Sequence, residues 1–279
     1  LKQSHRKILY ACFKKKLSYS GKSMKVAQLA GYVAEHTKYH HGEQCLFDTI
    51  TKLAQDFPGS NNIPLLYPDG QFGTRLNGGK DAANARYIFT KLSKFARILY
   101  PDIDDKVLDY RLEDGESVEP TYYCPIIPMI LVNGCSAGIG TGWSCSIPSY
   151  NPIDIINNVK NWLNDKDYID MVPWYKGYEG KIEKIDEHKF VSYGKIEKSN
   201  NTTEVTELPV MMWTDKFKEY IEDLLERKLV KRFKNYSTPD KIKFVINDTG
   251  DLNCTIDTLH LKTPISETNM VLFGNNNNL

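Results

Sequence analysis

The sequence lacks several features that define large classes of protein. No apolar run approaches the roughly 20 residues that a membrane-spanning helix needs. No signal-peptide pattern opens the chain, and no period typical of solenoid repeats is present. We therefore expect ordinary globular domains and no membrane partner.

Cysteine is present, but not at the spacing of metal sites or disulfide frameworks. The six cysteines are scattered, without a CxxC pair. Free thiols in a reducing compartment are the simpler interpretation. The acidic run Asp102–Asp105 is expected to be a solvated loop. We therefore predict no metal site within this sequence.

Length and composition favour two domains with real cores. The chain has 279 residues, of which 41% are hydrophobic. It begins at Leu1 without Met and ends in an asparagine run, Asn275–Asn278, followed by Leu279. We expect it to be a fragment of a longer protein.

Charge is distributed unevenly along the chain. The net charge is +1, but residues 1–100 contain 16 Lys and Arg against 6 Asp and Glu, a net charge of +10. Residues 101–120 contain eight acidic and two basic residues. This pattern predicts one domain that meets a polyanion and a second that mostly does not. A solvated basic face without a partner is the alternative that charge alone leaves open.

Apolar periodicity predicts three helices in the basic region, over 5–16, 24–36 and 43–57. Three helices with a short turn between the first two fit a helix-turn-helix core. Residues 58–85 are rich in Gly, Pro and Asn, and we expect a β-wing there with a hairpin at Asn77–Gly79.

The acidic segment marks the expected boundary between the domains. We predict a buried strand over 124–134, a glycine-rich loop over 135–143 and an amphipathic helix after Pro152. Alternating strands are expected over 180–212, a helix over 216–230 and a strand over 241–247. The predicted fold class is α+β, with a winged-helix domain at 1–120 and a mixed α/β domain at 121–275.

The segment Gln71–Leu92 contains the most specific chemical signal. Tyr87 follows three cations, Arg75, Lys80 and Arg86, and the pair Gly78–Gly79. A phenol is almost entirely protonated at neutral pH, so its attack on a phosphodiester needs a nearby cation, base or metal.

His40 and His41 are the local candidates for that help. They precede an expected helix start, where backbone amides favour anions. A His-His pair is also common as polar surface or hydrogen-bonded structure. Both interpretations stay open at this point.

Two glycine-rich segments invite nucleotide-binding interpretations that their spacing does not support. In GTRLNGGK, 73–80, Gly79 stands where a phosphate-binding loop needs lysine, and Asp81 replaces Ser or Thr. A turn that brings backbone close to phosphate fits this segment better. GIGTG, 138–142, is not GxGxxG, and its Ile139 is either a buried plug or a functional apolar side chain.

Several segments together resemble the eukaryotic-type IIA DNA topoisomerases, the topoisomerase II family. The resemblance rests on LKQSHRKILYACFKKK, KVAQLAGYVAEHTKYHHGEQ, GSNNIPLLYPDGQFGTRLNGGKDAANARYIFT, VEPTYYCPIIPMILVNG, GIGTGWS, ELPV–WT and NMVLF. It covers essentially the whole chain. It implies a winged-helix domain followed by a tower domain.

The resemblance also implies roles for individual residues. Tyr87 matches the family's DNA-cleaving tyrosine, Arg86 its neighbouring arginine, and His41 the active-site histidine. Lys2 matches the lysine of LKPGQRK, and Ile139 matches the isoleucine that intercalates and bends DNA. The candidate DNA contacts are Arg6, Lys7, Lys25, Gln28, His40, Lys80 and Ile139.

The implied activity is transient double-strand DNA cleavage, strand passage and religation by a homodimer that needs Mg²⁺ and ATP. The ATPase, the TOPRIM metal site and the coiled-coil gate are expected outside this sequence. The implied location is the nucleus, or the host nucleus or cytoplasm for a large DNA virus. Two departures stand out: LKQSHRK replaces LKPGQRK, and CSA, 135–137, is one residue longer than usual.

Two other classes of function remain open on sequence alone. One is a winged-helix module that reads DNA sequence and cleaves nothing. The other is a structural dimerisation scaffold, which would not need the basic N-terminal third.

Overall fold

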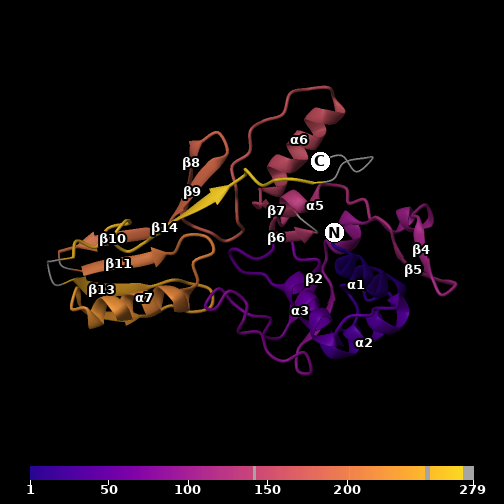
Figure 1. Ribbon diagram of the computed structural model, residues 1–279, viewed down its shortest axis with the longest axis horizontal. Coiled ribbons are helices and arrows are strands. Elements are labelled where there is room, and N and C mark those ends of the chain that lie inside the picture. Colours follow the sequence, from indigo (N-terminus) through magenta and orange to yellow (C-terminus); the bar gives the residue numbers. More distant parts are fainter. Residues whose placement is uncertain (141–142, 201, 249–251, 273–279) are drawn as a thin grey trace. The chain divides into compact units, whose positions relative to one another are not determined.

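The computed structural model describes residues 1–140, 143–200, 202–248 and 252–272 (Figure 1). It divides the chain into two compact units. Unit 1 comprises residues 1–56, 63–73 and 81–129, and unit 2 comprises 57–62, 74–80 and 130–279. Two short segments of the expected wing therefore belong to unit 2, and residues 121–129 belong to unit 1. The assignment of the winged-helix and tower names to 1–120 and 121–275 stays a prediction.

Unit 1 is built on three helices, as the apolar periodicity predicts. They are α1 (Gln3–Lys14), α2 (Val26–Thr37) and α3 (Glu43–Ala54). Each buries one stripe of apolar side chains, such as Ile8, Leu29 and Ile50. Burial of each large side chain contributes about 1.5–3 kcal/mol, so the three stripes together hold the helices on one core.

A small antiparallel sheet accompanies these helices. Its strands are β1 (Met24–Lys25), β2 (Leu66–Asp69) and β3 (Phe89–Leu92), in the order β1-β3-β2. Lys25 pairs with Phe89, and Asp69 pairs with the same residue from the other side. The helices and this sheet form the expected winged-helix arrangement.

The remaining elements of unit 1 follow the sheet. They are α4 (Ala96–Leu99), the 3-10 helix η1 (Asp102–Lys106) and the hairpin of β4 (Tyr110–Glu113) with β5 (Glu116–Pro120). The expected solvated loop is partly ordered by an ion pair, because Arg97 donates to both carboxylate oxygens of Asp105, at 3.0 and 2.8 Å.

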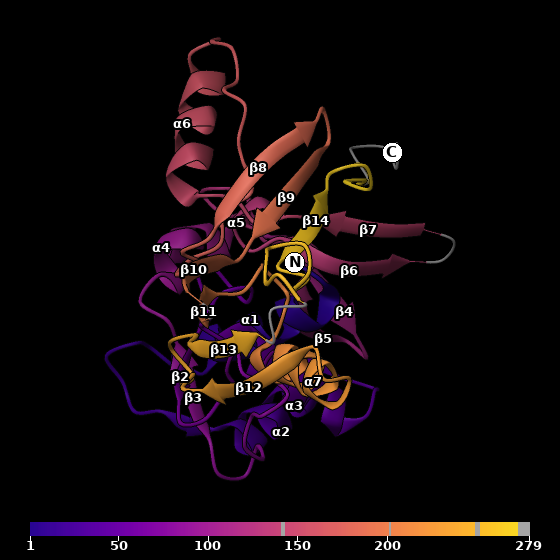
Figure 2. The same cartoon turned by 90° about the vertical axis from the view of Figure 1, so that its left-hand side faces the viewer.

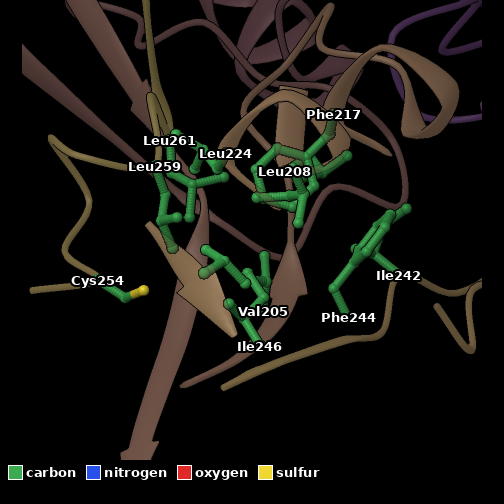
Figure 3. Packing of buried hydrophobic residues seen from close by; sticks show 12 residues of the cluster. Val205, Leu208, Phe217, Leu224, Ile242, Phe244, Ile246, Cys254, Leu259 and Leu261 are labelled. Carbon is green, nitrogen blue, oxygen red and sulfur yellow. The ribbon is translucent and has the colours of Figure 1, made fainter. Parts of the chain in front are cut away.

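Unit 2 has an open four-stranded sheet in the order β10-β11-β13-β12. The strands are β10 (Lys195–Ser199), β11 (Thr202–Glu207), β12 (Val230–Asn235) and β13 (Phe244–Asp248), and helix α7 (Thr214–Glu226) lies along them (Figure 1). The core between helix and sheet includes Phe217 and Phe244, whose rings meet edge to face with centroids 4.9 Å apart (Figure 3). These elements confirm the strands and the helix predicted for this region.

Two further sheets and two helices complete unit 2. A three-stranded sheet has the order β14-β9-β8, from β8 (Lys181–Asp186), β9 (Lys189–Tyr193) and β14 (Lys262–Ser266). Strands β6 (Cys135–Gly140) and β7 (Trp143–Ile147) form a separate hairpin (Figure 2). Helix α6 (Pro152–Leu163) begins after Asn151, as predicted, and short helix α5 (Met129–Val132) lies at the unit boundary.

Two predicted elements are wrong. The segment 124–134 is not a strand: it holds α5, preceded by residues without regular structure. Pro125 and Pro128 lack the amide hydrogens that a central strand donates. Residues 77–79 form turns rather than a strand hairpin. Among the described helices, none is long and apolar enough to cross a membrane.

Candidate functional site

Tyr87 lies on a turn that is ordered by its own side-chain and backbone hydrogen bonds. The Arg86 amide donates to Asn84 Oδ1 at 3.1 Å, and the Tyr87 amide donates to the Asn84 carbonyl at 2.9 Å. The Tyr87 residue is 76% exposed, and Arg86 is also exposed. The phenol is therefore accessible to a large ligand while its backbone is held.

The same turn is fastened to the amino end of α2. The Ala27 amide donates to the Ala85 carbonyl at 3.1 Å, and the Val26 amide donates to the Ile88 carbonyl at 3.0 Å. These amides belong to the first turn of the helix, which has no partners for them within the helix. Because the buried residues Ala85 and Ile88 flank the turn, Tyr87 projects from a fixed base.

Two more candidate residues lie near this base. Lys25 precedes α2 and is paired with Phe89, and its Nζ lies 5.9 Å from the centre of the Phe89 ring. Gln28 is exposed in the first turn of α2. We call Tyr87, Arg86, Lys25 and Gln28 the tyrosine cluster.

The other candidate residues of unit 1 lie at the opposite end of α2. His40 and His41 are in the linker from α2 to α3, and Lys2 and Arg6 are at the amino end of α1. The two regions are joined by Lys7, whose ammonium donates to the Thr37 carbonyl in the last turn of α2. We call Lys2, Arg6, His40 and His41 the histidine cluster.

The structure therefore does not bring His41 to Tyr87 within one chain. Helix α2 has 12 residues, which at 1.5 Å per residue is a length of about 18 Å. The expected convergence of phosphate-binding groups around one hydroxyl is wrong for a single chain. What exists instead is two clusters, one at each end of α2.

The histidine cluster contains one free-standing ring and one ring that is already bound. His41 is exposed, and its ring lies edge-on to Tyr39 with centroids 5.4 Å apart. His40 Nε2 lies 2.8 Å from Glu113 Oε1. This hydrogen bond is the main reason why the pKa of Glu113 is lowered. His40 is thus a less direct candidate for phosphate than His41.

Lys7 corrects one sequence-based assignment. The residue is 5% exposed, and its ammonium lies 2.8 Å from Glu119 Oε2. A buried, paired ammonium is not available to a phosphate, so Lys7 is not a direct DNA contact. Arg6 is half-buried and donates to the carbonyls of Leu1 and Pro120, at 2.9 and 3.2 Å. Burial is the main cause that lowers the Arg6 pKa.

The candidates in unit 2 are described separately from those of unit 1. Lys80 is exposed at the end of the segment 74–80. The backbone of Ile139 belongs to β6 and pairs with Ser144, whereas its side chain lies outside the described part of the structure. Its assignment as an intercalating residue stays a prediction.

Arg75 is the second cation that the structure removes from the expected phosphate-binding set. It is 5% exposed, and its guanidinium faces the carboxylate of Glu207, with Nη1 3.4 Å from Oε2. The turn after it packs on Trp213 rather than opening towards a ligand, because a Cβ on Gly78 would lie 2.4 Å from the Trp213 ring. The segment 74–80 is therefore a core contact of unit 2.

The described residues include no group of three His, Cys, Asp or Glu that could hold a metal ion. An open pocket of about 260 Å³ in unit 2 is lined by residues that include Asp154, Trp174 and Tyr178. It contains none of the candidate residues. The candidate site is therefore an exposed surface rather than a pocket.

Sequence reasoning missed two sets of residues that shape the site. One is Asn84, whose side chain closes the turn of Tyr87; an Asn three residues before a functional tyrosine is a recognisable turn signal. The other is the acidic hairpin β4–β5, with Glu113 and Glu119, which reads in sequence only as a charged boundary.

Comparisons with known proteins agree on one family. The family model for DNA gyrase/topoisomerase IV matches residues 1–279. The chain is 50% identical over 252 residues to DNA topoisomerase 2 top-2 of Caenorhabditis elegans, covering 88% of this chain and 16% of that protein. It is 47% identical over 284 residues to DNA topoisomerase 2 of Invertebrate iridescent virus 6, covering 98% of this chain and 24% of that protein.

A solved structure is similar over nearly the whole chain. It is the DNA-binding, cleavage and re-ligation domain of topoisomerase II from Plasmodium falciparum. The TM-score is 0.94 at 46% sequence identity, and the match covers 99% of this chain and 39% of the other.

Proposed function

The chain belongs to the DNA gyrase/topoisomerase IV family, and from that premise we propose that it is the tyrosine-bearing part of a type II DNA topoisomerase. It spans about a sixth to a quarter of the length of the relatives compared, 16% and 24%. The activity therefore belongs to a longer protein, and this chain supplies the nucleophile.

The observation that carries the proposal is the exposed Tyr87 on a backbone that is fastened to α2. In the proposed reaction the Tyr87 oxygen attacks a backbone phosphorus in line and loses its proton. The bond from phosphorus to the 3′ oxygen breaks, and that oxygen takes up a proton. The products are a 5′-phosphotyrosyl link and a free 3′-hydroxyl, and the reverse reaction reseals the strand.

The other candidates have supporting roles in this proposal. Arg86 is exposed beside Tyr87, and its guanidinium would stabilise negative charge on the phosphoryl group in the transition state. Lys25, Gln28 and Lys80 would contact the DNA. Lys2, Arg6, His40 and His41 form a second contact region, with His41 as its most accessible imidazole. Ile139 would insert between base pairs and bend the duplex.

The proposed partners and cofactors follow from the family. Double-stranded DNA is the substrate, and two copies of the full-length protein would act as a homodimer that cuts both strands. We assign no Mg²⁺ ligand to the described residues, which contain no suitable cluster. Mg²⁺ and ATP would be bound by other parts of the longer protein, and the nucleus is the proposed location in a cellular host.

A non-catalytic winged-helix reader is less well supported. Such a module needs several Arg, Asn or Gln side chains on the reading helix. The first turn of α2 offers chiefly Lys25 and Gln28. It also leaves the exposed Tyr87 without a role.

The test is Tyr87→Phe in the complete enzyme. Cleavage and plasmid relaxation should be lost, because only the nucleophilic oxygen is removed, while DNA affinity in a filter-binding assay should stay within about twofold. Tyr19→Phe is the matched control, since it removes the same atom from another exposed tyrosine of unit 1. Relaxation by the Tyr87 variant at a rate near that of the control would overturn the proposal.

A further inference from the structure

The acidic hairpin β4–β5 contacts both chain segments that form the histidine cluster. From the linker after α2, the Lys38 ammonium lies 3.0 Å from Glu116 Oε2, and His40 lies 2.8 Å from Glu113 Oε1. From α1, Gln3 Nε2 donates to Glu119 Oε1 at 3.1 Å. The hairpin is thus the common partner of two segments that are far apart in sequence.

Glu119 is the buried centre of these contacts. Its side chain is 0% exposed, and it faces Lys7, Gln3 and Arg111, the last at 3.0 Å. A buried carboxylate needs several donors to compensate for the loss of water. Lys7 in turn donates to the Thr37 carbonyl and lies 4.0 Å from Glu113 Oε2. The charges of α1, α2 and the hairpin therefore depend on one another.

The linker of His41 is short and its conformation is constrained. Lys38 has a φ of +48°, which is uncommon for a residue with a side chain. His41 itself has only the edge contact with Tyr39 that orients its ring. Glu113 therefore holds the residue next to His41, while the His41 ring faces solvent.

We propose that the β4–β5 hairpin is a positioning element for phosphate contact by the histidine cluster, with Glu113 acting on His41 through His40. This inference rests on the proposed function. Glu113 does not touch DNA in this scheme. It restricts the orientations of the 38–42 linker, so that less freedom is lost when His41 meets a phosphate.

The test is a double-mutant cycle with Glu113→Gln and His41→Ala in the complete enzyme, with the DNA cleavage rate as the readout. Glu113→Gln alone should lower the rate about fivefold to tenfold, the scale of a partly exposed charged hydrogen bond. In the His41→Ala background the same substitution should have no further effect, because the residue through which it acts is gone. Equal losses in both backgrounds would overturn the proposal.

Asp114→Asn is the matched control. It removes one negative charge from the adjacent residue, at the exposed turn of the same hairpin, and asparagine tolerates its φ of +52°. It should leave the cleavage rate within about twofold. A loss as large as that of Glu113→Gln would point to general electrostatics and contradict the assignment.

A second measurement separates misfolding from mispositioning. In NMR spectra of the chain, Glu113→Gln should shift or broaden the His40 and His41 imidazole signals while the thermal midpoint changes little. Unchanged His41 signals would also overturn the proposal. The outcome is independent of the Tyr87 test, because loss of cleavage by Tyr87→Phe would leave the proposed function intact even if Glu113 proved to be neutral.

Discussion

At the scale of single residues, Gly78 shows how tightly a turn can be tied to a distant side chain. Its φ is +60°, and an added Cβ would lie 2.4 Å from Trp213 atoms. Gly177 has a similar φ of +77°, but its nearest neighbour is Pro58 at 3.3 Å. Both glycines belong to unit 2, so the pair separates backbone strain from steric overlap.

Gly78→Ala should therefore destabilise unit 2 more than Gly177→Ala. Positive φ costs an alanine about 1–2 kcal/mol at either position, and overpacking against Trp213 adds about 1–3 kcal/mol at Gly78. All four tryptophans lie in the sequence of unit 2, so denaturant unfolding followed by tryptophan fluorescence measures the difference. Equal losses for the two variants would contradict the close contact.

At the scale of elements, α6 forms readily but buries little of its surface. Asn151 accepts a hydrogen bond from the Ile153 amide at 2.9 Å, and Pro152 occupies the first turn. Ile155 is the buried residue of this helix, whereas Ile153, Trp162 and Leu163 are 60%, 62% and 67% exposed. Local capping therefore contributes a large share of what holds α6.

Asn151→Ala should open α6 locally. Loss of the cap costs about 1 kcal/mol, which corresponds to roughly fivefold faster hydrogen exchange of amides in 152–163. The exposed mid-helix substitution Asn157→Ala is the control and should change exchange little. Exchange that accelerates equally throughout unit 2 would show that α6 opens only with the rest of that unit.

At the scale of the whole molecule, the separation of the two clusters has a consequence for a homodimer. Tyr87 and His41 lie at opposite ends of a 12-residue helix, too far apart for one imidazole to reach the phosphate at its own Tyr87. In the proposed homodimer, we expect His41 of one protomer to serve the Tyr87 phosphate of the other.

Heterodimers with a single Tyr87 test this expectation through single-strand nicking. Pairing a Tyr87→Phe protomer with a His41→Ala protomer should preserve nicking, because the intact tyrosine still meets the partner's intact histidine. Placing both substitutions in one protomer opposite a wild-type protomer should reduce nicking. The reverse ranking would place both residues at the same phosphate within one protomer. A heterodimer of Tyr87→Phe with wild type is the reference.

Stability of both units should fall in alkaline solution. Burial raises the pKa of the Cys12 thiol in unit 1 to about 12, and burial raises the pKa of Tyr175 in unit 2 to about 12. Groups with a raised pKa in the folded state contribute stability that is complete below their unfolded pKa, near 9 for Cys12 and 10 for Tyr175. That contribution is lost as the pH rises towards the folded values.

The size of this effect is measurable. A shift of two units corresponds to about 2–3 kcal/mol for Tyr175 between pH 10 and 12. Denaturant unfolding at several pH values should show this loss, and Tyr175→Phe should make the decline less steep. A stability that is constant from pH 8 to 11.5 would contradict the burial of these groups.

Residues close together in the chain suffice to predict most of the elements and the family. The periodicity of α1, α2 and α3, the N-terminal signal of α6 and the resemblance around Tyr87 are all local, because each depends on residues within a few turns of one another. The predicted strand over 124–134 fails for a reason that is also local, since two prolines interrupt it.

Packing between remote segments, in contrast, determines which charges are available to a ligand. Lys7 and Arg75 look like surface cations in sequence, but carboxylates more than 100 positions away bury and neutralise them, with Glu119 opposite Lys7 and Glu207 opposite Arg75. The separation of His41 from Tyr87 is likewise invisible in sequence, because it depends on the direction in which α2 runs between them. Net charge counts residues, whereas burial and distance depend on how distant parts of the chain fold against one another.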